Sequence, residues 1–296
     1  MNLTLHDAII AALCYANIFD YPLTEEEVRT WLPYVRNYPR QSLKKIYSSF
    51  HPTRRLFEIR KKREAWSIDK WTRAQWIANL LKHIPTIMLI GVTGGLTRSN
   101  VRASDDIDFF IITASKTMWM TRALSTILLD ILHLRRRPGD TNVRDLVCLN
   151  MFMSVNGLAI PQKERDLFTA HEVLLMTPLW ERDNTYSMFL RANTWVRKFL
   201  PNAWEEKVKS SREAGSRSAG QKSKVKSQKS YKAFSIFEPI ARFIQLRYMR
   251  KRQTSEVVSD KVIRFHPRDA RVWIKRDLGE RLMRFNVPLD KIFYGR

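Results

Sequence analysis

The chain has 296 residues, of which 44% are hydrophobic and 27% are charged, and this composition excludes a protein that is disordered throughout. Lys and Arg number 52 against 29 Asp and Glu, so the formal net charge is +23. This excess of positive charge indicates a polyanionic partner such as a nucleic acid, a nucleotide or an acidic surface. The length predicts two or three domains.

Cysteine usage and the apolar segments bear on the compartment. Cys14 and Cys148 lie far apart without C-x-x-C spacing, which predicts neither a disulfide framework nor a zinc site. The N-terminus lacks the basic and apolar regions of a signal peptide. The longest weakly polar stretch, 146–160, is shorter than the roughly 20 residues that span a bilayer. We therefore expect a cytoplasmic protein with no membrane partner.

The first 78 residues predict helices followed by a hairpin. A helix is expected around Ala8–Leu13, a second begins with a capping box formed by Thr24 and Glu27, and a third covers 42–50. The short apolar runs 56–59 and 65–68 predict two strands joined by a charged turn. Three helices and a hairpin are typical of a winged helix, so residues 1–78 are predicted to form a winged-helix-like domain.

Residues 79–165 predict a sheet covered by helices. A helix over 69–83 leads into this segment and ends before Pro85. Strands are expected over 86–92, 107–113 and 146–153, with a helix over 117–134. This order predicts an α+β fold with a mixed sheet.

The remainder of the chain is expected to be mostly helical, with one interruption. Helices over 167–177 and 184–199 define a helical extension, 166–204, with Pro201 at its end. Residues 205–233 are rich in Lys and Ser and predict a basic flexible linker. Residues 234–296 are expected to form a C-terminal helical region that includes a helix over 237–252. The basic charge concentrates here, because residues 205–296 carry a net charge of +14.

Two glycines and two aspartates carry the functional signal. Gly94 and Gly95 follow a predicted strand, and the absence of side chains lets the backbone approach a ligand closely. Asp106 and Asp108 stand at the start of the next strand, where a period of two places both carboxylates on one face. Neighbouring carboxylates repel each other unless a cation lies between them, and Mg²⁺ prefers such oxygen ligands. The pattern predicts a Mg²⁺ site.

This pattern of two glycines, a spacer and Asp106-Ile107-Asp108-Phe109 resembles the signature of the DNA polymerase beta-like nucleotidyltransferase superfamily. The wider chain is similar to uncharacterised bacterial proteins that place a winged-helix-like segment before such a domain. The resemblance implies that Gly94 and Gly95 contact nucleotide phosphates and that Asp106 and Asp108 bind Mg²⁺.

The sequence departs from that signature at two places. Many members have Ser where this chain has Gly95, and active members usually have a third carboxylate on a later strand. Asp145 is the nearby residue for that third catalytic role. Arg98, in the loop between the glycines and the aspartates, is a second phosphate-binding candidate, although loops are often basic for solubility alone.

Two functions remain open at this point. The first is a Mg²⁺-dependent nucleotidyltransferase that moves a nucleoside monophosphate from an NTP to an acceptor hydroxyl and releases pyrophosphate. The second is a non-catalytic nucleic-acid-binding or regulatory module with a degenerate fold, in which the winged helix or the basic C-terminal region contacts the nucleic acid.

Overall fold

A mixed sheet forms the centre of the protein in the computed structural model, which describes residues 3–36, 38–49, 54–218, 231, 234–249, 257–264 and 270–294. The six strands follow the order β4-β1-β2-β3-β6-β5. They are β1 (Ile87–Val92), β2 (Ile107–Thr113), β3 (Val147–Ser154), β4 (Thr177–Glu181), β5 (Val257–Val258) and β6 (Val262–Arg264). Strands β2 and β3 are parallel, whereas the other neighbouring pairs are antiparallel. The predicted α+β fold with a mixed sheet is confirmed at this level.

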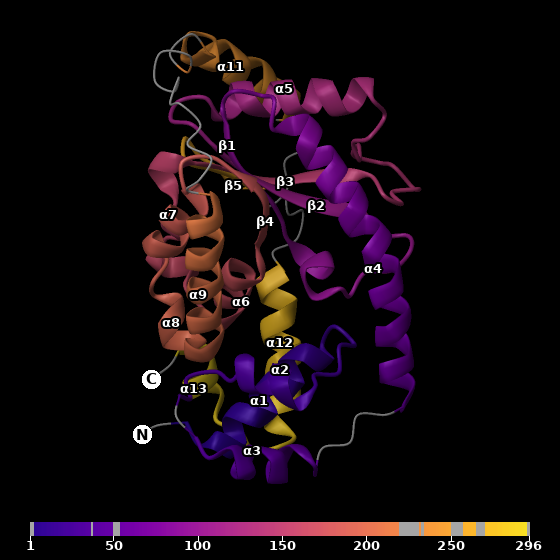
Figure 1. The fold of residues 1–296 in the computed structure, drawn as a ribbon, viewed down its shortest axis with the longest axis vertical. Helices are drawn as coiled ribbons and strands as arrows, with labels where there is room; N and C mark the ends of the chain where they lie inside the picture. The colour runs from indigo at the N-terminus through magenta and orange to yellow at the C-terminus, as the bar shows by residue number, and fades with distance from the viewer. Residues whose placement is uncertain are drawn as a thin grey trace.

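Helices cover both faces of the sheet and extend beyond it at one end (Figure 1). In chain order they are α1 (Leu5–Asn17), α2 (Glu25–Thr30), α3 (Arg40–Tyr47), α4 (Arg54–Leu81), α5 (Met118–Ile131), α6 (Leu167–Leu175), α7 (Thr185–Ala192), α8 (Val196–Phe199), α9 (Pro201–Ser218), α11 (Glu238–Met249), α12 (Ala270–Met283) and α13 (Leu289–Tyr294). Short 3-10 turns are η1 (Gly94–Arg98), η2 (Val155–Gly157) and η3 (Gln162–Glu164).

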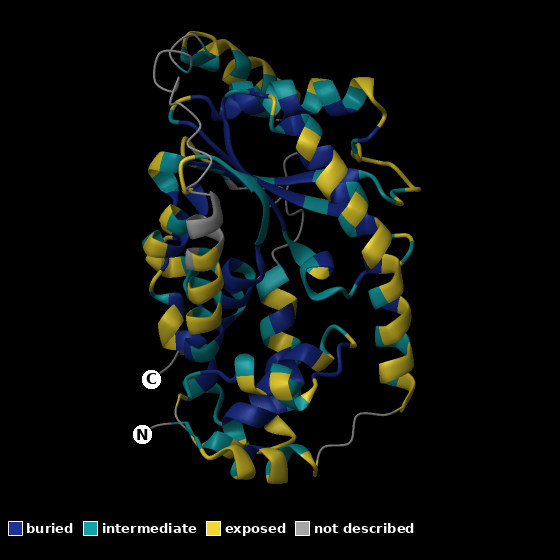
Figure 2. Cartoon of the chain, in the orientation of Figure 1, coloured by how far each residue is buried: buried dark blue, intermediate teal, exposed yellow. Residues whose placement is uncertain are grey.

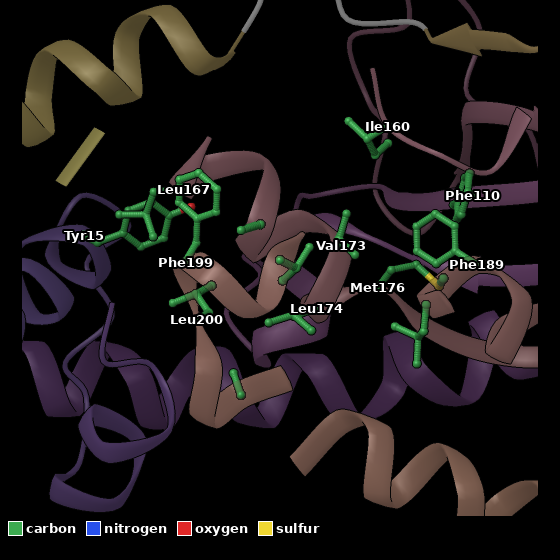
Figure 3. Close-up of a cluster of buried hydrophobic side chains, with 14 of the residues drawn as sticks. Tyr15, Phe110, Ile160, Leu167, Val173, Leu174, Met176, Phe189, Phe199 and Leu200 are labelled. Carbon is green, nitrogen blue, oxygen red and sulfur yellow. The ribbon is translucent and has the colours of Figure 1, made fainter. Parts of the chain in front are cut away.

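Alternation along β2 divides the core into two layers. Ile107 and Phe109 pack with α4, α5 and Met249 of α11 on one face. Phe110 packs with α6, α7, α8 and α12 on the opposite face. Figure 3 shows this second layer, in which Phe110, Val173 and other side chains from distant parts of the chain meet. Because side chains alternate along a strand, Asp108 faces the same layer as Phe110.

The N-terminal helices have a small core of their own and are fastened to the rest of the protein. Residues of α1, α2 and α3 share a separate apolar cluster. The C-terminal helices α12 and α13 lie beside this part in Figure 1. The Tyr34 hydroxyl donates to the Ile292 carbonyl at 2.7 Å, and Arg281 donates to the Asn17 side chain at 2.6 Å. The two ends of the chain therefore stabilise each other.

Most elements of the first half were predicted close to their observed positions. The Thr24 and Glu27 capping box is present, and strands β1, β2 and β3 fall where the apolar runs placed them. Helix α5 also agrees with the expected helix. These elements have strong local signals, which are side-chain caps or uninterrupted apolar runs.

The predicted hairpin is wrong, because both of its runs, 56–59 and 65–68, belong to the single helix α4. The segment between them contains no Gly, Pro or Asn to form a turn, and its charges support a helix instead. Arg54 pairs with Glu58 and Arg60 pairs with Glu64, both at i,i+4 spacing. The helix expected over 69–83 is the second half of α4, and the predicted domain boundary at 78 falls inside it. No wing is present among residues 54–81.

Part of the predicted linker is also helical. Helix α9 begins at Pro201, a residue that suits the first helical position, and runs through Ser218. Ala203 is buried, and the Asn202 side chain donates to the Arg29 carbonyl at 3.0 Å. The rest of the linker, 219–230 and 232–233, lies outside the described residues. Strands β4, β5 and β6 were not predicted; β4 follows the helix expected over 167–177 and pairs with β1.

A buried histidine joins the N-terminal helices to α6. His171 stacks on Tyr15 and on Trp31, with ring centroids 3.9 Å and 5.3 Å away, and its Nδ1 lies 2.8 Å from the Leu167 carbonyl oxygen. Burial lowers the pKa of His171 from 6.5 to about 3, with a smaller contribution from Arg98. The folded protein therefore holds this imidazole neutral.

This histidine should make the fold sensitive to mild acid. Between pH 6.5 and pH 3 the unfolded chain binds a proton that the folded state excludes, so stability falls as the pH decreases, by up to about 1.4 kcal/mol per pH unit. Between pH 7.5 and pH 5.5, the free energy of unfolding of His171→Phe should fall by about 1 kcal/mol less than that of wild type, as measured by urea unfolding. The exposed His83→Gln should behave as wild type. An unchanged pH dependence in His171→Phe would contradict this account.

Candidate active site

The glycine turn connects β1 to the site. Gly94 has φ of +71°, a conformation that favours glycine, and a Cβ built on it would lie 2.7 Å from Asp108 Oδ2. A Cβ on Gly95 would lie 3.2 Å from the Asn100 carbonyl oxygen. The Thr93 amide donates to the Asp108 carbonyl at 3.0 Å and holds the turn against β2. The first glycine is therefore required both by its backbone angle and by the closeness of Asp108.

Asp106 and Asp108 come together as predicted, and a third side chain joins them. Ligand atoms of Asp106, Asp108 and Cys148 all lie within 4.8 Å of one another. Cys148 enters this group because Asp108 and Cys148 are paired in the parallel register of β2 and β3. The third member of the group is therefore a thiol from the neighbouring strand and not Asp145, the carboxylate that the sequence predicted.

The electrostatics of this group favour a bound cation. Burial and the neighbouring Asp106 raise the pKa of Asp108 to about 7. Among the described residues, Arg136 is the cationic partner of this group, with Nη1 2.7 Å from Asp106 Oδ2. Burial and the two carboxylates raise the pKa of Cys148, so its thiol is protonated and donates to Asp108. Because two partly buried anions share one arginine, a divalent cation between them would relieve their repulsion.

Asp145, the expected third catalytic residue, is held by other partners. Lys70 Nζ lies 2.6 Å from Asp145 Oδ1, and Arg73 donates to the Asp145 backbone carbonyl at 2.8 Å. Burial alone would raise the pKa of Asp145, but the hydrogen bond and charge of Lys70 lower it. Asp145 does not belong to the metal-ligand group found among the described residues. Its carboxylate stabilises the base of the site and is a weak proton acceptor.

Lys70 also reaches the loop that carries the first aspartate. Its ammonium group donates to the Asp105 carbonyl at 2.6 Å and to the Ala103 carbonyl at 3.3 Å, and its side chain is only 2% exposed. The residue comes from the middle of α4, so the long helix fixes the backbone immediately before Asp106. Sequence reasoning missed this role, because the three partners become neighbours only in the folded sheet.

A cavity of about 550 Å³ lies beside this group. Its lining includes Gly94, Gly95, Phe110 and Asn150, together with side chains of α6 and α12. Gly94 lines the cavity and lies directly against Asp108, so the cavity adjoins the carboxylate pair at the glycine turn. Its size suits a small organic ligand.

Two polar atoms on the cavity wall, Asn150 Oδ1 and Arg98 Nη2, have no hydrogen-bond partner among the described residues. Asn150 is 7% exposed, and its Oδ1 accepts no hydrogen bond. Arg98 Nη2 is buried without a hydrogen bond; its guanidinium lies 4.6 Å from the Phe19 ring centroid, and Nη2 lies 3.8 Å from a Glu172 carboxylate oxygen. One acceptor and one cationic donor are therefore available to a ligand, because buried polar groups are normally satisfied. Arg98 faces the cavity as a candidate for an anionic group.

Comparisons with protein-family models, with curated proteins and with solved structures found no match for this chain. None of the described helices combines the length and apolar character needed to cross a bilayer. Both cysteines are free thiols.

The repulsion between the two aspartates predicts an unusual effect of substitution. Asp108→Asn removes a partly buried charge and keeps the side-chain shape, so we expect it to stabilise the metal-free protein by about 1 kcal/mol at pH 8. Asp106→Asn should not stabilise the protein, because it leaves Arg136 without its carboxylate. Urea unfolding in EDTA measures both effects. Equal destabilisation by the two substitutions would show that the repulsion is absent.

Loss of Lys70 should weaken the base of the site. Lys70→Met leaves Asp145 and the Asp105 carbonyl without their cationic partner. We expect the free energy of unfolding to fall by about 2 kcal/mol. This is less than the usual cost of breaking a buried pair, because the Asp145 side chain is one third exposed. The exposed Lys62→Met on the same helix is the matched control. Thermal or urea unfolding of Lys70→Met within about 0.5 kcal/mol of wild type would contradict the assigned role.

Proposed function

We propose that this protein is a divalent-cation-dependent nucleotidyltransferase, which moves a nucleoside monophosphate from an NTP to the hydroxyl of a small acceptor. The observation that carries the proposal is the approach of Gly94 to Asp108, which brings a glycine turn and the pair of carboxylates to one point. From the sequence motif, we propose that the domain built on this sheet belongs to the DNA polymerase beta-like nucleotidyltransferase superfamily. Free cysteines and the use of NTPs fit a cytoplasmic location.

The donor set fits a metal ion of the expected kind. Asp106 and Asp108 offer carboxylate oxygens within 4.8 Å of each other. Burial and the charge of Asp106 raise the pKa of Asp108, and a cation would offset both effects. Asp106 and Asp108 would hold Mg²⁺, with Cys148 remaining a protonated donor to Asp108. When bound, Mg²⁺ supplies charge stabilisation to the transferring phosphoryl group.

The residues of the chain position the reactants around that point. Gly94 and Gly95 let the NTP phosphates approach the backbone closely. The acceptor oxygen forms a bond to the α-phosphorus while the bond between the α-phosphorus and the bridging oxygen breaks. Pyrophosphate leaves, and the hydroxyl proton passes to water. The cavity beside the turn would hold the acceptor, with Asn150 accepting from its hydroxyl or amine groups and Arg98 facing an anionic group.

One observation favours a second function. The third position of the site holds Cys148, and Asp145 is tied to Lys70. A site without a third carboxylate favours the non-catalytic module, which would bind nucleotide or nucleic acid without turnover. The absence of a wing in residues 54–81 removes one predicted nucleic-acid contact, so the basic C-terminal region would have to make it.

Transfer of labelled nucleotide tests the proposal. The full chain is incubated with each α-labelled NTP, Mg²⁺ or Mn²⁺ and pools of RNA, metabolites and protein as acceptors, while pyrophosphate release is followed. We expect transfer that falls about 10³-fold in Asp106→Asn and Asp108→Asn, since these residues hold the catalytic charge. The exposed Asp183→Asn is the matched control and should keep full activity.

Gly94→Ala provides a second test, because its Cβ would overlap Asp108 and the backbone angle disfavours alanine. It should lose more activity than Gly95→Ala, whose Cβ meets the Asn100 carbonyl less closely. Binding of NTP and Mg²⁺ without pyrophosphate release from any acceptor pool would contradict the transferase and support the non-catalytic module.

A further inference from the structure

Helix α11 carries a row of large apolar side chains that face solvent. Phe237 directly precedes the helix, and the other members recur at three- and four-residue spacing. The row consists of Phe237, Ile240, Phe243, Ile244 and Tyr248, whose exposed fractions lie between 54% and 69%. We call these five residues the α11 stripe. Figure 2 shows exposed and intermediate residues along this helix. Contiguous exposed apolar surface of this kind marks an interaction site.

The orientation of the stripe is fixed by contacts on the other side of the helix. The Glu238 carboxylate accepts from the Trp119 and Met120 amides, each at 2.8 Å, and so caps the start of α5. The Gln245 side chain donates to the Trp119 carbonyl at 2.8 Å, and Met249 is buried in the core. Helix α11 is therefore docked on α5 by its polar and buried face, and the stripe is its outward face.

The stripe lies at the end of the molecule opposite the N-terminal helices. In Figure 1, α11 and α5 form the outer layer beyond the sheet, far from α1, α2 and α3. Helix α5 adds two exposed apolar side chains, Ile127 and Ile131, to the same end. The apolar surface is thus carried by two packed helices rather than by a terminus.

The sequence that flanks the stripe is strongly basic. Between 222 and 252 the sequence has one acidic residue, Glu238, and that carboxylate is turned toward α5. The basic residues of this segment are Lys222, Lys224, Lys226, Lys229, Lys232, Arg242, Arg247, Arg250, Lys251 and Arg252. On α11 itself Arg247 is exposed, whereas Arg242 pairs with Asp260 at 3.0 Å. Such a segment is attracted to a negatively charged surface.

Taken together, we propose that α11 binds an anionic lipid membrane, with its axis in the plane of the surface and the stripe among the lipid headgroups and upper acyl chains. An exposed apolar row on a helix whose flanking sequence is basic matches a helix that lies on a membrane. A nucleic acid would leave the apolar row without a partner, and a protein interface is usually depleted in Lys. The proposal departs from the sequence-based prediction of no membrane partner. It agrees with the absence of a spanning helix among the described residues, because an in-plane helix does not cross the bilayer.

Vesicle flotation tests this proposal directly. The full chain is mixed with vesicles of phosphatidylcholine, or of phosphatidylcholine and phosphatidylglycerol at three to one, in low and high salt. We expect flotation with the anionic vesicles in low salt, and at least about fivefold less with neutral vesicles or high salt, because the attraction is partly electrostatic. Phe243→Ser with Ile244→Ser should lower the partition coefficient about tenfold or more.

The control replaces exposed apolar residues elsewhere. Trp76 of α4 and Met188 of α7 are also exposed, and Trp76→Ser with Met188→Ser should float as wild type. Circular dichroism confirms that both double variants remain folded. The proposal is overturned if wild type does not float with anionic vesicles, or if the stripe variant floats equally well. It is also overturned if the wild type is a dimer that does not float and the stripe variant is a monomer, because the stripe would then bind a second copy of the chain.

Discussion

The site depends on the repulsion between two carboxylates that the fold holds together. Asp106 precedes β2 and Asp108 lies within it, and the parallel pairing with β3 adds the Cys148 thiol to the same face. Gly94 packs so closely against Asp108 that a Cβ would not fit. The charge of Asp106 is partly balanced by Arg136, whereas burial and Asp106 together raise the pKa of Asp108. A divalent cation bound between the two carboxylates would reduce this repulsion.

Long-range elements keep the arrangement rigid. Helix α4 runs from the N-terminal helices to the sheet (Figure 1), and its Lys70 donates to the Asp105 carbonyl in the loop that leads to Asp106. Near the middle of the same helix, Arg63 donates to the Asn100 side chain at 3.0 Å, beyond the glycine turn. The N-terminal part of the chain thus contributes to the site through packing and hydrogen bonds, and this role does not require it to bind DNA.

The sequence was most informative where the signal was local. The apolar runs of β1 and β2, the capping box at Thr24 and the pairing of Asp106 with Asp108 were all predicted from neighbouring residues. The predicted hairpin within α4 was wrong because two short apolar runs resemble strands, although the segment between them has no turn-forming residue. Cys148, Lys70 and β6 could not be assigned to the site or the sheet in advance, since strand register and contacts over 33 to 113 residues of sequence are decided by tertiary packing. Asp145 was predicted to join the catalytic residues only because it lies near them in the sequence. In the structure it forms an ion pair with Lys70 instead.

The central claim is that Asp106 and Asp108 together bind a divalent cation, and Mn²⁺ titration followed by electron paramagnetic resonance tests it most directly, because bound Mn²⁺ loses the sharp signal of the free ion. The account predicts binding by the wild-type chain that Mg²⁺ displaces and that disappears in the double variant Asp106→Asn with Asp108→Asn. Equal Mn²⁺ binding by wild type and the double variant, or none by wild type, would contradict it.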